Sequence, residues 1–238
     1  MGSHWAGGAP ATELAAFQHP CFARFYDRVS QAAAARDPQR TARYRARLLG
    51  GLAGRVIDVG AGNGLIFAHY PPRVTEVVAV EPDDLLRARA EREAASAYVP
   101  VTVLPGHAGA LPAADGTFDA AVVSLVLCSV PDPAAALAEI GRVLRPGGVL
   151  RFFEHVRSSR PLRGRLEGLV SPLWSRAAGG CRLDRDLGSA IQAAGFTIET
   201  VEHHGIRPVP FLPALTHIRG TALRPCSAAV GECGEVVR

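Results

Sequence analysis

A glycine-rich segment runs from Asp58 to Gly64 with the sequence Asp-Val-Gly-Ala-Gly-Asn-Gly, directly after a short apolar run. Alternate glycines let a backbone adopt positive φ and approach a bound ligand closely. A dinucleotide-binding loop is spaced Gly-x-Gly-x-x-Gly, and its third glycine would fall where Leu65 stands. The Gly-Lys-Ser/Thr ending of a phosphate-binding loop is missing as well. The acidic Asp58 before the glycines favours a ligand that carries positive charge.

A second carboxylate, Glu81, ends the next apolar run of the chain. An acid about 20 residues beyond a nucleoside-binding loop accepts hydrogen bonds from ribose hydroxyls. Considered alone, Glu81 could instead be a neighbour of a helix N-cap. Together with Asp58 and the glycine turn, it fits a ligand with an ammonium, a sulfonium and a ribose. These residues therefore predict S-adenosylmethionine as the cofactor and methyl transfer as the chemistry.

The acceptor of the methyl group is expected beyond the carboxyl ends of the later strands, where ligands of α/β proteins bind. Displacement at a sulfonium mainly requires alignment, and a base only when the acceptor keeps its proton. His155 is the first candidate for a base and His217 the second, with a purely structural histidine as the alternative for each. Ordinary core packing is the alternative for the remaining candidates. The expected acceptor-binding residues are Phe22, Phe25, Tyr26, Cys128, Glu154, Trp174 and Phe211.

These residues need a sheet to position them, and apolar runs alternate with helix-like stretches as in a parallel α/β protein. Strands are expected at 55–59, 76–81, 101–104, 118–127, 149–153, 196–201 and 217–223. Helices are expected directly after the glycine loop and at 30–49, 83–97, 132–145, 166–176 and 183–194.

A single domain is expected, because no internal repeat or linker divides the 238 residues. Its parts would be an N-terminal helical cap (1–50), a cofactor-binding core (51–156) and a helical insertion over the acceptor site (157–182). The C-terminal part of the sheet (183–225) and a tail (226–238) would follow.

Composition narrows the class further. The chain is 48% hydrophobic with a net charge of +4, which excludes disorder, and no run approaches the roughly 18 apolar residues of a membrane span. Its five cysteines show no Cys-x-x-Cys pair, so we expect no metal and a reduced, cytoplasmic protein. Arginine clusters are interpreted as solvated surfaces rather than a nucleic-acid site. The expected partner is a small-molecule acceptor, with the chain a monomer or a homodimer.

Several motifs resemble those of class I methyltransferases, most of all the small-molecule branch with the ubiquinone and menaquinone biosynthesis enzymes. They are Asp58–Gly64, Glu81, Leu111–Pro112 before Asp115–Asp119, and Arg142–Gly148. A second series is similar to the methyltransferase-like seven subfamily, whose mammalian members methylate alkyl thiols. That series is Ser124–Val130, Glu154–Val156 and Gly180–Leu183.

The resemblance implies a Rossmann-like fold with a mostly parallel seven-stranded sheet and helices on both faces. It places the methionine end of the cofactor on Asp58, Gly60 and Gly62, the ribose on Glu81, and the adenine over Pro82. The rest of the expected cofactor site is Ala61, Asn63, Gly64, His107, Ala108 and Ser124. Two departures stand out: His107 and Gly109 replace acids that many relatives carry, and we expect no apolar membrane anchor like that of the mammalian thiol enzymes.

The implied function is S-methylation of natural-product or xenobiotic thiols. The main alternative is O- or C-methylation of a phenol, quinone or other secondary metabolite. A nucleic-acid methylase is less favoured, because the end of the fourth expected strand is Ser-Leu-Val-Leu where a methylase of base amines has an Asn/Asp-Pro-Pro-Tyr-like turn. A non-catalytic S-adenosylmethionine-binding protein is also less favoured, although the motifs do not exclude it.

Overall fold

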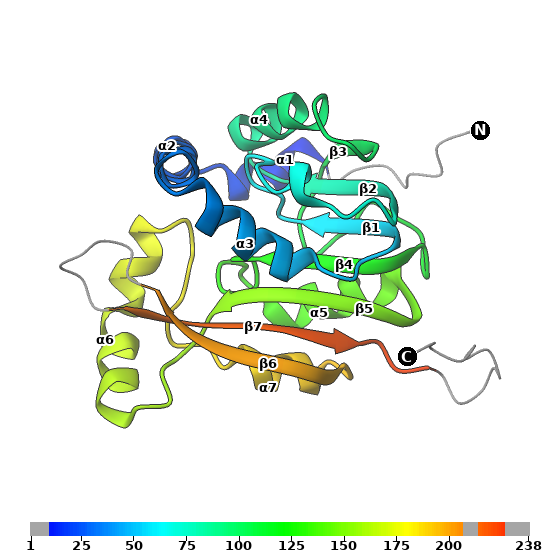
Figure 1. The fold of residues 1–238 in the computed structure, drawn as a ribbon. Coiled ribbons are helices and arrows are strands. Elements are labelled where there is room, and N and C mark those ends of the chain that lie inside the picture. Colours follow the sequence, from blue (N-terminus) through cyan, green and yellow to red (C-terminus); the bar gives the residue numbers. More distant parts are fainter. Residues whose placement is uncertain (1–9, 207–213, 227–238) are drawn as a thin grey trace.

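A seven-stranded sheet forms the centre of the computed structural model, which describes residues 10–206 and 214–226 (Figure 1). The strand order is β3-β2-β1-β4-β5-β7-β6, and β7 runs antiparallel to both of its neighbours. The strands are β1 Gly54–Val59, β2 Val74–Glu81, β3 Val101–Pro105, β4 Phe118–Ser124, β5 Leu144–His155, β6 Thr197–Ile206 and β7 Leu215–Leu223. The mostly parallel seven-stranded sheet is therefore confirmed.

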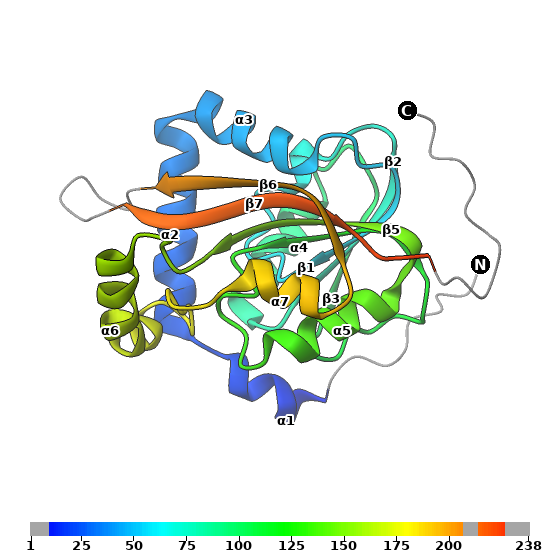
Figure 2. The same cartoon turned by 90° about the horizontal axis from the view of Figure 1, so that it is seen from below.

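Helices cover both faces of the sheet (Figure 2). They are α1 Ala11–Leu14, α2 Pro20–Arg36, α3 Pro38–Leu49, α4 Asp84–Ala94, α5 Pro133–Val143, α6 Pro161–Ala177 and α7 Leu187–Ala193, with 3-10 turns η1 Ala15–Phe17 and η2 Phe67–His69. On one face, Leu48, Phe67 and Ala90 pack against the strands, and on the other face Leu137 and Ile191 do so. The core is thus two apolar layers separated by the sheet.

Strands β1 and β4 lie side by side at the centre, and the chain leaves them in opposite directions along the sheet. Their pairing puts Asp58 of β1 opposite Val122 of β4, near the carboxyl ends of both strands. A crevice at such a switch point is where open α/β sheets bind their ligands. The topology therefore places the glycine loop after β1 at the expected binding edge.

Two expected helices are wrong in their bounds. The single helix predicted over 30–49 is two helices, because Asp37 caps the second one by accepting a hydrogen bond from the Arg40 N–H at 2.9 Å, and Pro38 cannot continue the first. The helix predicted after the glycine loop is only the short turn η2, which Pro71 and Pro72 follow closely. The chain therefore returns to β2 almost directly.

Other bounds differ by a few residues. Strand β4 ends at Ser124 rather than Leu127, because Leu125 turns the chain with a φ of +61°. Strand β5 begins at Leu144 rather than at 149, and β6 continues to Ile206 rather than 201. Helix α7 begins at Leu187, where Asp186 caps it, rather than at Leu183.

Candidate active site

The glycine loop after β1 requires its glycines for space as well as for conformation. Gly60, Gly62 and Gly64 have φ values of +69°, +60° and +77°. A Cβ on Gly64 would lie 2.8 Å from the Cα of Ala90 in α4, and one on Gly60 would lie 2.5 Å from a methyl of Val126. The loop is therefore held tightly between α4 and the segment that follows β4.

Two buried carboxylates lie beside this loop. Glu81 accepts hydrogen bonds from the Gly62 N–H at 2.8 Å and from the Asp83 N–H at 3.0 Å, while Asp58 accepts one from the Tyr70 hydroxyl at 2.9 Å. Burial raises the pKa of Asp58 to about 7, and burial likewise raises the pKa of Glu81 to about 7. A ligand with positive charge would favour the ionised form of both groups.

The N-terminal segment crosses the ends of β2 and β3. The Gln18 side chain donates to the Pro82 carbonyl at 2.8 Å, and the His19 N–H donates to Asp83 at 3.2 Å. His107 stacks on Phe17 with ring centroids 4.7 Å apart, and these residues bound the position at which the resemblance places the adenine. The segment therefore encloses one side of the expected cofactor site.

His107 has a defined hydrogen-bonding arrangement in this position. Its Nδ1 accepts from the Gly109 N–H at 3.1 Å, so its Nε2 carries the proton and donates to Glu13 at 2.8 Å. Ala108, beside it, is buried in the apolar core. Both residues lie directly after β3, and their contact with a cofactor stays a prediction.

Helix α2 is fastened to the glycine loop by polar side chains. The Asn63 amide donates to Asp27 at 2.9 Å and to the Ser30 hydroxyl at 2.8 Å. Arg89 of α4 pairs with the same Asp27 at 3.2 Å. The Asn63 side chain, expected to bind cofactor, therefore also holds α2 against the loop.

Glu154 organises the segment after β4. Its side chain is completely buried, and its two oxygens accept hydrogen bonds from the N–H groups of Val126 at 2.9 Å and Cys128 at 3.0 Å. Leu125, the residue before Val126, has a positive φ. This conformation is costly for a leucine and is typical of functional sites. Glu154, expected at the acceptor, is thus engaged by this loop and positions it.

Cys128, His155 and Cys181 meet beyond the ends of β4 and β5. The Nδ1 atom of His155 lies 3.3 Å from the sulfur of Cys181 and 3.7 Å from the sulfur of Cys128. The two sulfurs are 3.6 Å apart. Nothing in the sequence spacing of Cys181 predicts this contact.

His217, the second candidate for a base, lies opposite His155 across the β5–β7 pairing. The two rings are 4.1 Å apart between centroids, and His217 also stacks on Phe153. The His217 side chain is only 4% exposed, and burial, with the neighbouring His155, lowers its pKa to about 3. It is therefore neutral at physiological pH and a weak base.

The aromatic candidates for the acceptor pocket differ in position: three are partly buried and one is mostly exposed. Phe22 and Tyr26 lie one helical turn apart on α2, with Phe22 against Gly179 and Tyr26 against Gly62, so both face the space between the cofactor loop and the end of α6. Trp174 packs against the apolar core from α6. Phe25 is 63% exposed, and Phe211 lies outside the described residues.

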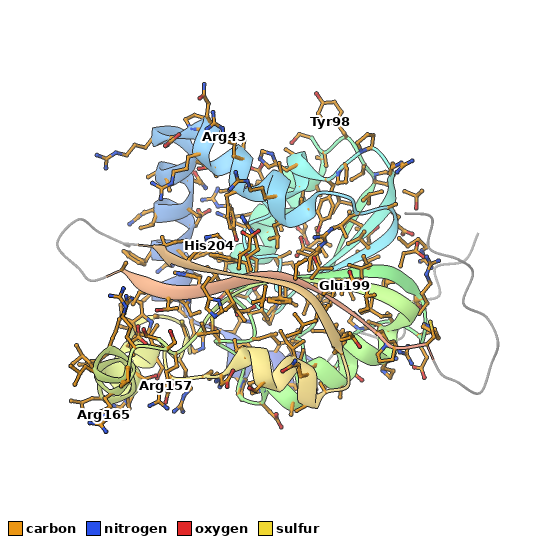
Figure 3. All side chains as sticks on the ribbon, turned by 60° about the horizontal axis from the view of Figure 1, so that its bottom comes forward. Arg43, Tyr98, Arg157, Arg165, Glu199 and His204 are labelled. Atoms are coloured by element: carbon orange, nitrogen blue, oxygen red, sulfur yellow. The ribbon has the colours of Figure 1, made fainter. Side chains whose placement is uncertain are left out.

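A cleft of about 730 Å³ opens between α3 and the ends of β6 and β7. Figure 3 labels Arg43 on α3 and His204 on β6, which both line it. Tyr44 and Phe153 lie at its inner end, and the Tyr44 hydroxyl is 3.3 Å from that of Ser124. The basic lining is Arg40, Arg43, Arg47 and Arg219, with His203 and His204, and Asp37 also lines the cleft.

Comparison with known proteins shows the family and the fold of the chain. Residues 57–152 match a methyltransferase domain family. The human thiol S-methyltransferase TMT1B is 34% identical over 184 residues, which cover 74% of this chain and 74% of that protein. Human thiol S-methyltransferase TMT1A is 31% identical over 71% of this chain and 70% of that protein. The solved YcgJ protein of Bacillus subtilis shares the fold, with a TM-score of 0.65 at 17% identity, covering 79% of this chain and 99% of that one.

The fold, the glycine loop and these relatives define an S-adenosylmethionine-dependent methyltransferase of class I. The chain belongs to the family that contains the thiol S-methyltransferases TMT1A and TMT1B. Within the part of the chain that the structure describes, no helix is long and apolar enough to cross a membrane.

Several functional residues escaped the sequence analysis. Tyr70, which donates to Asp58, follows the loop by a spacing that belongs to no motif, and Gln18 contacts the loop after β2 from far away in the sequence. Asp83 caps α4 and also receives the His19 N–H, and only the capping role was visible from its position.

Proposed function

We propose that this chain transfers the methyl group of S-adenosylmethionine to the sulfur of a small thiol. The observation that carries the proposal is the similarity, over about three quarters of each chain, to proteins named thiol S-methyltransferases. The acceptor side supports it, since two cysteine sulfurs and the His155 imidazole meet there and the neighbouring His217 is a weak base. O- or C-methylation of a phenol or quinone is the alternative.

In the proposed site, the cofactor lies over the carboxyl ends of β1 and β2. Asp58 and Gly60 to Gly62 hold its methionine end, and Glu81 holds the ribose hydroxyls. The sulfonium methyl then points towards the segment after β4, which Glu154 holds in place. Phe22, Tyr26 and Trp174 form the apolar wall of the acceptor pocket, and His155 lies at its floor.

The chemistry is an in-line displacement at the methyl carbon. The acceptor thiol loses its proton, its sulfur forms a bond to the methyl carbon, and the bond from that carbon to the sulfonium sulfur breaks. The products are a thioether and S-adenosylhomocysteine. A free thiol has a pKa near 8.5, so a fraction is already ionised at neutral pH and the protein mainly needs to align it.

The cleft beside α3 suggests which thiols enter. Its arginines and histidines favour a ligand that carries negative charge, and Tyr44 and Phe153 lie between the cleft and the ends of β4 and β5. We therefore infer that thiols bearing a carboxylate or a similar anionic group are accepted better than neutral thiols of the same size.

The experiment is a measurement of S-adenosylhomocysteine formation with matched acceptors. An aromatic thiol, the phenol of the same skeleton, and each compound with an added carboxylate would be compared at equal concentration. We expect the thiols to turn over at least tenfold faster than the phenols. Faster turnover of the phenols would overturn S-methylation and support the O-methyltransferase alternative.

A further inference from the structure

Cys128, His155 and Cys181 form a compact set of three soft ligand atoms. All three atoms lie within 4.8 Å of one another. The residues come from three places far apart in the sequence: the segment after β4, the last residue of β5, and the turn after α6. Thiolate sulfur and imidazole nitrogen are the ligands that structural and catalytic zinc sites use.

The spacing of the three atoms matches three corners of a tetrahedron around one zinc ion. With zinc bonds of about 2.3 Å to sulfur and about 2.05 Å to nitrogen, the edges of that tetrahedron are about 3.8 Å between sulfurs and about 3.6 Å between sulfur and nitrogen. The sulfurs here are 3.6 Å apart, and Nδ1 lies 3.7 Å and 3.3 Å from them. A few tenths of an ångström of movement would complete the triangle.

The surrounding backbone holds the ligands in this arrangement. The Cys128 N–H donates to Glu154 at 3.0 Å, and the Cys128 carbonyl accepts from the Arg182 N–H at 2.8 Å, which ties the two cysteine segments together. Gly180 has a φ of +88°, and a Cβ there would lie 2.6 Å from the Ser129 carbonyl oxygen. The turn that presents Cys181 is thus pressed directly against the segment that presents Cys128.

His155 is fixed from the other side by β7. Its ring lies 4.1 Å from the ring of His217, across the strand pairing, so its Nδ1 is directed at the two sulfurs. The sulfurs are buried, whereas His155 is half-buried. Three protein ligands with one open position are the pattern of catalytic zinc sites, since closed structural sites use four.

We propose that Cys128, His155 and Cys181 bind a Zn²⁺ ion and that the acceptor sulfur takes its fourth position. Two thiolates and a neutral imidazole balance the charge of the ion in a buried place. The first half of the proposal concerns only these side chains, and the second half rests on the proposed thiol acceptor. The three residues have no metal-binding spacing in the sequence, so only their position in the fold brings them together.

A zinc ion at this site would activate the acceptor thiol. The thiol releases its proton to solvent as its sulfur binds zinc, because metal ligands bind in their deprotonated form. The bound sulfur then attacks the methyl carbon, and the bond from that carbon to the sulfonium breaks. The product is a neutral thioether, which is a weaker zinc ligand than a thiolate and therefore leaves.

The first experiment measures metal in the absence of any acceptor. Protein produced with zinc present and then freed of loosely bound metal is analysed by elemental mass spectrometry. We expect close to one Zn²⁺ per chain in the wild type and in Cys21→Ser, whose cysteine is exposed and free. Cys128→Ser and Cys181→Ser are expected to retain less than a tenth of it, with folding checked by circular dichroism. Wild type without zinc overturns the proposal.

The second experiment uses Co²⁺ and does not depend on any variant. Metal-free wild type titrated with Co²⁺ should develop the thiolate-to-cobalt charge-transfer absorption and the intense visible bands of a tetrahedral ion. Addition of an aromatic thiol should increase the charge-transfer band, whereas the matched phenol should not. Weak six-coordinate spectra would overturn the site, and a spectrum unchanged by thiol would overturn the acceptor's place in it.

The two proposals can fail separately. Thiol methylation by protein that holds no zinc would overturn the metal site and leave the proposed function intact. Zinc bound at one equivalent in a protein that methylates only phenols would leave the site and overturn the function, together with the fourth-ligand half of the inference.

Discussion

In the cofactor half of the site, Asp58, Gly62 and Glu81 lie in two consecutive strand-and-loop segments, and Glu81 accepts a hydrogen bond from the glycine loop itself. In the acceptor half, the residues come from segments spread along the chain from α2 to β7, and Cys181 lies more than fifty residues from Cys128. One half is a local motif, and the other is assembled by the tertiary fold. The cofactor half can therefore be recognised from sequence. Substitutions that alter the backbone conformation of its glycine loop should destabilise it.

The acceptor half depends instead on side chains meeting in space. Its key contacts are between sulfur, imidazole and aromatic rings carried by α2, β5, β7 and the turn after α6. The partly exposed positions among them, such as His155 and Trp174, tolerate substitution better than a closely packed glycine loop. Substitutions there should change acceptor use more than folding or cofactor binding.

The largest effect is expected for Gly64→Ala in the cofactor half. The new methyl would lie 2.8 Å from the Cα of Ala90, at a residue whose φ is +77°. The strained conformation and the overpacking together should lower the free energy of unfolding by about 2–5 kcal/mol, measured by urea denaturation.

The matched control is Gly168→Ala in the middle of α6. No atom lies within 4 Å of a Cβ added there, so the change should be neutral or stabilise the protein by up to about 1 kcal/mol. Equal destabilisation by both substitutions would contradict the tight packing of the glycine loop.

A smaller loss is expected for Glu81→Ala, measured as the affinity for S-adenosylmethionine by calorimetry. Leaving ribose hydroxyls unpaired in a closed site should cost about 1–3 kcal/mol, which is roughly a 5- to 150-fold weaker Kd. Glu76→Ala is the control, because Glu76 lies on the same strand and is paired with Arg55 at 3.0 Å on its surface side. Unchanged affinity in Glu81→Ala would remove this carboxylate from the cofactor site.

The same carboxylates predict a pH dependence. Burial raises the pKa of Asp58 and that of Glu81 to about 7, so the folded chain binds their protons more tightly than the unfolded chain does. The contribution of these two carboxylates to the free energy of unfolding of the cofactor-free protein should therefore fall as pH rises from about 4 to about 7, with no further loss above that. The lowered pKa of His217 acts in the opposite direction, so the carboxylate contribution is measured as the difference between the wild type and Asp58→Asn across this pH range.

Cofactor affinity should change in the opposite direction. A cationic ligand binds the ionised carboxylates, so the Kd for S-adenosylmethionine should decrease as pH rises from 6 to 8. Below its pKa, each carboxylate should lower the Kd by up to about tenfold per pH unit. Asp58→Asn keeps the size of the side chain and should reduce the slope. A Kd that is flat across this range in the wild type would contradict the raised pKa values.

What the sequence could predict follows the same division. The Asp58–Gly64 loop and Glu81 could be predicted as a cofactor site because the residues that identify it are close together in the sequence. The sheet could be predicted because its strands are strongly apolar. Cys181 and Gln18 could not be predicted, because their partners are set by how α6 and the N-terminal segment pack. The Asp37-Pro38 pair indicates the break between α2 and α3, but the arginine-rich periodicity on both sides of it suggested a single helix.

The smallest effect is expected in the acceptor half, where Phe22 and Phe25 offer a matched pair on one helix. Phe22 contacts Gly179 beside the cysteine turn, whereas Phe25 is 63% exposed. Removing the Phe22 ring should raise the KM for a thiol acceptor about 3- to 10-fold, because about 1 kcal/mol of apolar contact is lost, and leave the Kd for S-adenosylmethionine within about twofold. Phe25→Ala should change neither constant, despite the expectation from sequence that Phe25 lines the acceptor pocket.

Steady-state kinetics with calorimetry on both variants separates the two constants. A larger KM change in Phe25→Ala than in Phe22→Ala would show that the acceptor binds on the outer face of α2. A large loss of cofactor affinity in Phe22→Ala would show that Phe22 also belongs to the cofactor site, against the separation of the two halves described above.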